Sequence, residues 1–258
     1  MRMSTRGFAI AAAVALAGLH LEIGQALQAQ GRGGAAQAPA TARAAAAFDP
    51  TGYWVAVITE DWRWRMVTPA KGDYQSIPIN AAAQKIADAW DPARDEAAGE
   101  QCKAYGAPGL MRGPTRLNIS WADDNTLKVE TDYGIQTRLL HFGNRKSDAA
   151  APSWQGESLA QWQGGRRGGG GEGTGTLVII TSNLRPGYLR KNGVPYSADT
   201  TMTEYWDLIV EPSGEQRLLM LLIVDDPVYL QQPWTVPVHF KKEPNGSKWD
   251  PTPCNAKF

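Results

Sequence analysis

The chain has 258 residues, and its 26 lysines and arginines balance 26 aspartates and glutamates, so the formal net charge is zero. This balance argues against a protein that binds nucleic acids through their phosphates. The length allows one large domain or two small ones.

The N-terminus has the layout of a secretory signal peptide. Two arginines precede an apolar run at 7–19, and small residues follow it, with candidate cleavage points after Ala26 or Ala29. The run is too short to span a bilayer comfortably. We therefore expect residues 1–29 to be a signal peptide that directs export to the periplasm or the medium, with no transmembrane span in the mature form. An uncleaved N-terminal anchor is the alternative.

A single domain is expected to follow a tail. Residues 30–47 contain no large apolar side chain, so they cannot bury enough surface to offset the entropy lost on ordering. We expect a flexible, low-complexity tail there and one β-rich domain over 48–258. Cys102 and Cys254 lie in this domain, and an isolated pair in an oxidising compartment most often forms a disulfide. Two free buried cysteines are the alternative.

The first strand is expected at 51–59, where β-branched and aromatic residues dominate. Strand geometry over the next residues would place Trp62, Trp64 and Met66 on one face. This pattern indicates either a core face or an aromatic platform at the rim of a pocket.

One or two short helices are expected after these residues. Asn80 is a suitable N-cap for a helix over 81–90. Asp91-Pro92 ends this helix and starts a second that runs towards Cys102, because proline suits the first helical position.

The remaining sequence alternates between strand and turn patterns with the spacing of an antiparallel meander. Strands are expected at 115–121, 126–131, 135–142, within 152–162, at 176–181, at the segment ending with Val210, and at 217–224. The fold class is therefore mainly β, an antiparallel barrel or sandwich with the short helices inserted near its N-terminal side.

Three further segments carry specific expectations. The glycine-rich residues 164–175 are expected to form a flexible loop, and they lack the pattern of a phosphate-binding loop. The continuous apolar run at 217–224 favours a strand that is buried on both faces, or one that the helix covers on its outer side. Pro233 and Pro237 place the following strand at an edge, or interrupt it.

The connector 184–197 is the most distinctive part of the chain. Its proline and its glycine or asparagine residues predict a defined shape. Its cations and phenols suit a carboxylate, a phosphate or a sugar, although a rigid connector with solvated cations is the alternative. The predicted ligand-binding residues are Trp62, Trp64, Arg185, Tyr188, Arg190, Asn192, Tyr196 and Glu204.

Glu204 shares a strand face with the apolar residues Met202 and Trp206. A carboxylate on such a face needs a partner or a function, because unpaired burial costs several kcal/mol. The expected structural partner is Arg185 or Arg190, and a ligand is the alternative.

The order of motifs in the C-terminal half is similar to that of a large group of exported bacterial proteins of unknown function, common in acidobacteria and some proteobacteria. The motifs are Trp154 to Thr181, Asn183 to Ser197, Thr203-Glu204-Tyr205, Asp225 to Tyr229 and Gln232-Pro233-Trp234. The glycine-rich insert departs from the group, which has a tight turn there. The resemblance covers most of the mature chain and implies a β-rich, lipocalin-like exported domain. It implies no activity.

Three classes of function follow. The leading hypothesis is a non-catalytic protein that binds a lipid-like or glycan-derived small molecule, in a pocket lined by Trp62, Trp64 and Tyr188 and gated by Arg190 and Tyr196. An envelope interaction or assembly module would instead have a filled barrel and an exposed apolar patch. A carboxylate-dependent hydrolase or isomerase would use Glu204 or Asp226, although Asp225-Asp226-Pro227 also fits a turn that ends a strand.

No pattern for a metal site, a cofactor or an activated nucleophile is present. His141 and His239 lack metal-ligand spacing, and no nucleophile elbow surrounds a serine. The sequence leaves the ligand's identity and the oligomeric state open.

Overall fold

The structure is a computed structural model that describes residues 40–59, 62–143, 151–164 and 175–256. The expected signal peptide, residues 30–39 of the expected tail and residues 165–174 of the glycine-rich loop lie outside the described residues.

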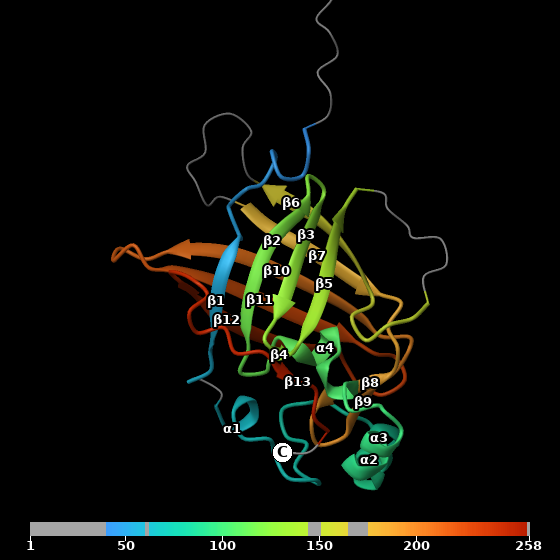
Figure 1. The fold of residues 1–258 in the computed structure, drawn as a ribbon. Helices are drawn as coiled ribbons and strands as arrows, with labels where there is room; N and C mark the ends of the chain where they lie inside the picture. The colour runs from blue at the N-terminus through green and yellow to red at the C-terminus, as the bar shows by residue number, and fades with distance from the viewer. Residues whose placement is uncertain (1–39, 60–61, 144–150, 165–174, 257–258) are drawn as a thin grey trace, which may run out of the picture. The chain divides into compact units, whose positions relative to one another are not determined.

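Nine strands of the described residues close into a barrel (Figure 1). They are β1 (Gly52–Val57), β2 (Arg116–Asp123), β3 (Thr126–Thr131), β5 (Gln136–Phe142), β6 (Glu157–Gly164), β7 (Gly175–Ser182), β10 (Thr201–Val210), β11 (Gln216–Asp225) and β12 (Trp234–Glu243). The order around the barrel is β1-β12-β11-β10-β7-β6-β5-β3-β2, and β5 and β6 form the one parallel pair among these strands. The predicted β class is confirmed, and of the two predicted architectures the structure has the barrel.

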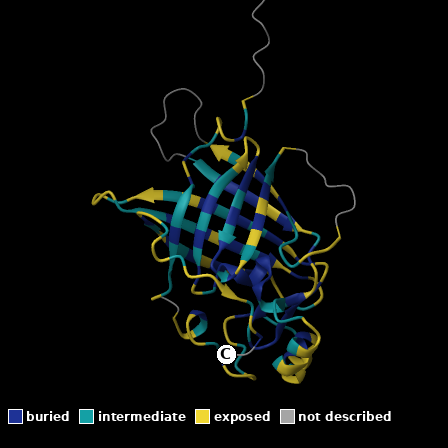
Figure 2. Cartoon of the chain, viewed as in Figure 1, coloured by how far each residue is buried: buried dark blue, intermediate teal, exposed yellow. Residues whose placement is uncertain are grey.

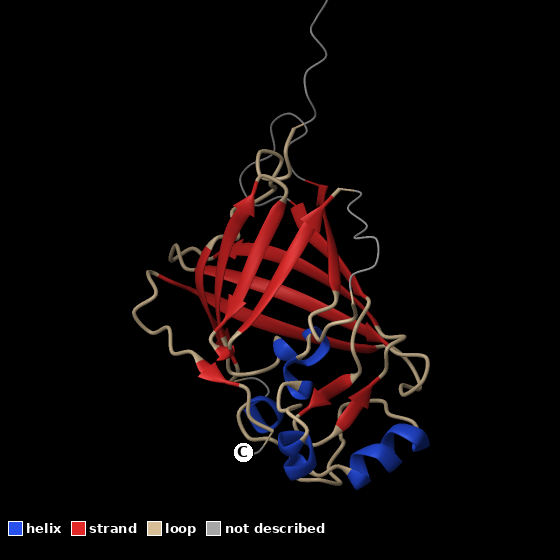
Figure 3. Ribbon diagram, turned by 45° about the vertical axis from the view of Figure 1, so that its right-hand side comes forward, coloured by secondary structure: helices blue, strands red, loops and turns tan. Residues whose placement is uncertain are grey.

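The short helices and small strands gather at one end of the barrel (Figure 3). They are α1 (Trp62–Arg65), α2 (Ala81–Ala89), α3 (Pro92–Ala97), the 3-10 helix η1 (Lys103–Tyr105), α4 (Ala107–Leu110), β4 (Tyr133–Gly134), β8 (Gly187–Arg190), β9 (Val194–Tyr196) and β13 (Thr252–Pro253). We call residues 62–112 and 184–200 the cap. The predicted caps of α2 and α3 are confirmed: the side chains of Asn80 and Asp91 each accept a backbone N–H at 3.0 Å.

Buried residues alternate with more exposed ones along the barrel strands (Figure 2). Inward residues alternate with outward ones along each strand, as the pleat requires. The inward Trp54, Trp206 and Phe240, with the aliphatic residues around them, have exposed fractions of 0–1%. Such values leave no room for a water molecule beside these side chains, so they form a packed core rather than a ligand chamber.

The end of the barrel opposite the cap is closed by residues 41–48. The backbone N–H of Ala42 donates to the side chain of Asn125, and its carbonyl accepts from the Trp162 indole at 3.0 Å. Phe48 packs edge-on against Trp162 with 5.1 Å between ring centroids. The structure therefore begins to pack at about residue 40, earlier than the expected boundary at Phe48. Local composition could not reveal these contacts, because the backbone supplies most of them.

Residues 62–65 form a helix, so the predicted strand with Trp62, Trp64 and Met66 on one face is wrong. Arg65 explains why these residues do not continue β1 as a strand, because its guanidinium donates to the carbonyls of Val57 at 2.7 Å and Arg112 at 3.0 Å. These bonds hold the chain back against the end of β1.

Two expectations about the last long strands also change. Strand β11 is not buried on both faces: its residues alternate, and Leu221 lies on the outer surface. Strand β12 is continuous through Pro237, although β1 pairs only with His239–Glu243. Pro237 therefore lies where β12 has a neighbour on one side only, and its missing N–H is tolerated there.

Cys102 and Cys254 form the predicted disulfide. Nearby, the short β13 pairs in parallel with β4, and the backbone N–H of Thr252 donates to the carbonyl of Asp132 at 2.8 Å. These contacts fasten the C-terminal segment beside η1.

Candidate functional site

The connector 184–197 forms the hairpin β8–β9 of the cap. Gly193 in its turn has φ +85°, the left-handed region that favours glycine. A Cβ atom at this position would lie 2.3 Å from the Cβ of Trp90. Glycine thus permits the close approach of the turn to the end of α2, and the predicted defined shape of the connector is confirmed.

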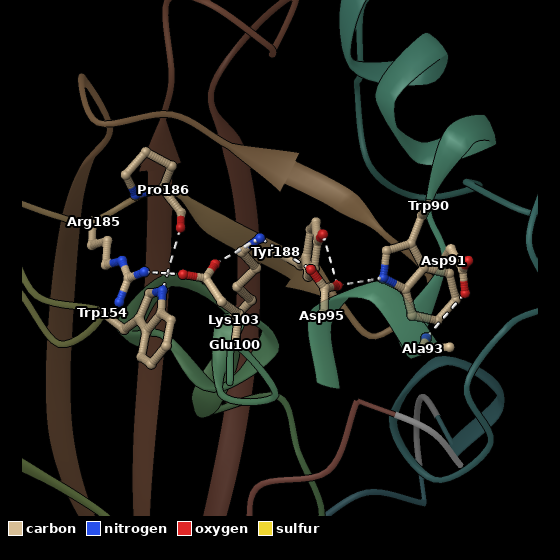
Figure 4. A network of polar contacts seen from close by, with 10 residues as sticks. All are labelled: Trp90, Asp91, Ala93, Asp95, Glu100, Lys103, Trp154, Arg185, Pro186 and Tyr188. Carbon is tan, nitrogen blue, oxygen red and sulfur yellow. Dashed lines mark hydrogen bonds and ion pairs between the residues drawn. The ribbon is translucent and has the colours of Figure 1, made fainter. Parts of the chain in front are cut away.

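Asp95 is the centre of a polar network between this hairpin and α3 (Figure 4). Its Oδ2 accepts from the Tyr188 hydroxyl at 2.9 Å and from the Trp90 indole at 3.2 Å. Its Oδ1 accepts from the Lys103 ammonium at 3.0 Å. The carboxylate therefore holds three segments of the cap together.

The network continues through Glu100, which accepts from Lys103 at 2.8 Å and pairs with Arg185. The hydrogen bond from Lys103 lowers the pKa of Glu100, and the charge of Arg185 lowers it further. The Arg185 guanidinium also stacks 4.5 Å from the ring centroid of Trp154 (Figure 4). Acids and bases thus alternate from Asp95 to Arg185, and most of their charge is compensated.

A shallow, solvent-open pocket with room for about one water molecule lies beside this network. Its walls are Trp90, Asp95, Glu100, Gln101, Lys103, Ala104, Tyr188, Lys191 and Ala256. The Oε1 atom of Gln101 is buried without a hydrogen-bond partner. The walls of this pocket thus combine two aromatic rings with charged groups that are already paired.

The pH dependence of Tyr188 tests the network. Burial raises its pKa, and the hydrogen bond to Asp95 raises it further. Because the pKa of Tyr188 is higher in the folded than in the unfolded chain, its neutral hydroxyl stabilises the fold. This contribution to the free energy of unfolding is complete below pH ~10 and is lost as the pH rises above that value. We expect Tyr188→Phe to leave the 295 nm phenolate absorbance of the folded protein at pH ~11 unchanged. An absorbance lower by one tyrosine would contradict this placement.

Three of the predicted binding residues instead fix the connector in place. The Arg190 guanidinium donates twice to the carbonyl of Gln75 at 3.1 Å, and the Asn192 amide donates to the carbonyl of Asp73 at 2.9 Å. Tyr196 is fully buried, and its hydroxyl lies so close to Gly106 that a Cβ there would be 2.1 Å away. These side chains bind the loop before α2 and the start of α4, and none lines the pocket.

The other predicted binding residues are dispersed. Trp62 and Trp64 lie on α1, where Trp62 is 59% exposed and Arg63 stacks 5.1 Å from the Trp64 ring. Arg185 contacts the network from outside the pocket. Of the eight predicted residues, the pocket is lined by Tyr188 alone.

Glu204 lies inside the barrel, and its partner is Arg138 rather than Arg185 or Arg190. Two hydrogen bonds of 2.5 and 3.2 Å join the guanidinium of Arg138 to the carboxylate. The Arg138 guanidinium also donates to the Thr181 hydroxyl at 3.2 Å, and the hydroxyl oxygens of Ser158 and Thr181 are hydrogen-bonded at 2.8 Å. All four side chains are buried. This cluster is a buried polar layer within the apolar core, and within it the Nε atom of Arg138 has no hydrogen-bond partner.

Asp226 organises the loops at the end of β11. Its carboxylate accepts from the backbone N–H of Ser197 at 2.6 Å, from the hydroxyl of Thr200 at 2.8 Å and from the backbone N–H of Val228 at 2.8 Å. It also accepts from the Ser197 hydroxyl and from Tyr229. Both oxygens are therefore used in the turn, as the strand-ending interpretation predicts.

We expect Asp226→Asn to lower the free energy of unfolding by about 2 kcal/mol, because an amide cannot accept bonds at both terminal atoms and leaves buried donors unpaired. Denaturant unfolding followed by tryptophan fluorescence measures this change. Asp225→Asn is the matched control, since Asp225 is exposed, and it should leave stability unchanged. Equal effects of the two substitutions would contradict the assignment.

The outer surface of the barrel carries a large uncharged area, which we call the uncharged face. The strand registers place two adjacent cross-strand rows there. The first row is His141, Leu159, Ile180, Thr203, Ile223 and Thr235, and the second is Gln161, Val178, Tyr205, Leu221 and Pro237. Neither row contains a lysine, arginine, aspartate or glutamate. Leu159, Ile180 and Leu221 are 41%, 49% and 40% exposed, whereas Val178 in the second row is buried.

The opposite side of the barrel carries charged and polar side chains, as most protein surfaces do. There Lys128 pairs with Glu130 at 3.1 Å, and the side chain of Asn118 donates to the same glutamate. The two sides of one barrel thus differ in charge, and the uncharged face is the exception that needs a physical explanation.

Within the described residues, no group of three or more histidine, cysteine, aspartate or glutamate side chains is arranged to hold a metal ion. The helices of the same residues are all too short or too polar to cross a bilayer. Comparison with protein-family models gives no match, and neither curated proteins nor solved structures include a significant similarity to this chain. The resemblance to the exported bacterial group therefore stays a prediction.

Proposed function

We propose that this protein is an exported, non-catalytic binding module whose contact surface is the uncharged face of the barrel. The observation that carries the proposal is the pair of adjacent rows on β5–β7 and β10–β12 without a single charged side chain, outside a barrel whose described inward side chains are packed together. Exposed apolar surface of this kind is typical of sites of macromolecular contact. Export rests on the sequence of residues 1–29 and is supported by the disulfide, because disulfides persist in oxidising compartments.

Catalysis is not part of the proposal. A hydrolase or isomerase needs a carboxylate that reaches its substrate. Glu204 is sealed in the core against Arg138, and Asp226 uses both oxygens in its turn. The two candidate carboxylates therefore have structural roles that account for their burial.

Site-specific photo-crosslinking in the producing cells tests the proposal. A photoreactive residue at Leu221 should yield a discrete crosslinked product, because this position lies within the uncharged face. The same residue at Lys128, on the charged side, is the matched control and should yield none. Absence of a product at Leu221, or identical products at both positions, would contradict the proposal.

The cap pocket supports a second candidate, the binding of a small glycan-derived molecule. The observation in its favour is that the rings of Trp90 and Tyr188 both form part of the wall of this solvent-open pocket. Native mass spectrometry of the protein from its own cells should then detect an adduct that denaturation releases and that Trp90→Ala lacks. A chain without an adduct would exclude this candidate.

A further inference from the structure

The chain contains two asparagine-glycine pairs, Asn192-Gly193 and Asn245-Gly246. In such a pair the backbone nitrogen of the glycine is unhindered, because no Cβ shields it. This nitrogen can attack the amide carbon of the asparagine side chain, which makes these pairs chemically labile. The surrounding structure decides whether the two groups are able to react.

The first pair is held in an unreactive arrangement. Asn192 is 1% exposed, and its side-chain amide donates to the carbonyls of Asp73 at 2.9 Å and Ala70 at 3.4 Å. The backbone N–H of Gly193 donates to the carbonyl of Arg190 at 3.2 Å. Attack would have to break these hydrogen bonds in a packed site, so this pair is protected unless the β8–β9 hairpin opens.

The second pair lies in the loop 244–251 between β12 and β13 (Figure 1). The side chain of Asn245 is exposed, and Gly246 is partly exposed. Within the described residues, neither the side-chain nitrogen of Asn245 nor the backbone N–H of Gly246 donates a hydrogen bond. Both reacting groups of this pair are therefore open to water.

The same loop also activates the side chain of Asn245. The backbone N–H of Ser247 donates to its Oδ1 atom at 2.9 Å, as in an Asx turn. Negative charge develops on this oxygen when a nucleophile attacks the amide carbon, and a donor that is already in place stabilises that charge. The N–H of Trp249 donates to the carbonyl of Gly246 at 3.0 Å and holds the turn.

We propose that Asn245 is a site of spontaneous deamidation and that Asn192 is protected from it. The nitrogen of Gly246 loses its proton to hydroxide and forms a bond to the Cγ of Asn245, and the side-chain nitrogen takes up a proton and leaves as ammonia. The product is a succinimide ring. Water then opens the ring at the side-chain carbonyl to give aspartate, or at the main-chain carbonyl to give isoaspartate. The whole reaction consumes one water and releases one ammonia.

The modification has a local structural consequence. Isoaspartate inserts one more carbon into the main chain directly before Gly246, where space is short, because a Cβ on this glycine would lie 2.6 Å from the Cζ of Tyr53. The Tyr53 ring packs edge-on against Trp249 with 5.9 Å between centroids. Isoaspartate therefore disturbs this aromatic contact, and either product adds one negative charge to a chain whose formal net charge is zero.

Peptide mapping of the folded protein after incubation in warm, mildly alkaline buffer tests the proposal. The tryptic peptides 243–248 and 192–217 each contain one asparagine, Asn245 and Asn192, so mass spectrometry follows the two sites separately. Asn245 should lose its amide at least about tenfold faster than Asn192. Chromatography should resolve peptide 243–248 into aspartate and isoaspartate forms of equal mass. Asn245→Gln is the matched control, because glutamine closes a ring far more slowly, and its peptide should keep its mass.

The unfolded chain separates the effect of the structure from that of the sequence. In denaturant with a reductant, both pairs should react at similar rates, because neither keeps its native hydrogen bonds. Equal rates at Asn192 and Asn245 in the folded protein would overturn the inference. An Asn245 that keeps its amide in the folded protein but loses it in the unfolded chain would overturn it as well, since the loop would then protect this residue.

Discussion

Replacing Arg138 by methionine is expected to lower the free energy of unfolding by about 3–5 kcal/mol, because Glu204 would be left buried without its cation. Denaturant unfolding followed by tryptophan fluorescence measures this loss. Arg94→Met is the matched control, since the Arg94 side chain is 83% exposed and its contact with Asp91 is 3.5 Å. That variant should change stability by less than about 0.5 kcal/mol.

A double variant separates the lost partner from the lost packing. Arg138→Met combined with Glu204→Met removes both charges and keeps the volume, so it should recover most of the stability. If the single and double variants were equally unstable, the burial of an unpaired carboxylate would not be the cause. A loss below 1 kcal/mol in the single variant would contradict the buried pair itself.

Replacing both cysteines by alanine is expected to lower the free energy of unfolding by about 5 kcal/mol in the chain-entropy model. The disulfide joins Cys102 and Cys254 across 152 residues, so its removal increases the conformational entropy of the unfolded chain considerably. The same unfolding experiment with and without a reductant checks the prediction. The native chain should lose stability on reduction, and the double alanine variant should not respond. Equal stability of the native and variant chains would contradict it.

The strands were the most predictable part of this protein. Thr126–Thr131 alternates clearly, and its predicted bounds are those of β3. Asn80 and Asp91 cap their helices as expected, because capping depends on a side chain and the next few residues. In each case the signal lies within one turn or one strand.

The sequence predicted that Glu204 pairs with a cation, but it did not predict which one. A carboxylate between Met202 and Trp206 had to find a cation, yet the nearest cations in sequence proved to serve other contacts. Arg138 lies 66 residues away, and only the order of strands in the barrel brings it near. One signal was available, since Arg138 shares its strand face with Leu140 and Phe142.

The structure does not bring the predicted binding residues together, and the reason is related. Arg190 and Asn192 look like free donors in the sequence, but carbonyls of residues 70–76 occupy them. The uncharged face could not be predicted from the sequence either, because its rows run across strands from β5 to β12. Leu221 lies within a continuous apolar run, and alternation cannot tell which of its neighbours points outward. Register, rather than composition, creates this surface.

The central claim is that the barrel is filled and that binding takes place on its outer face. Titration with N-phenyl-1-naphthylamine, a fluorescent probe that enters apolar chambers, tests it most directly. The structure predicts no saturable one-to-one binding in Leu221→Lys, in which the interior is intact and the uncharged face carries a charge. Saturable equimolar binding that this variant retains would place a chamber inside the barrel and contradict the claim.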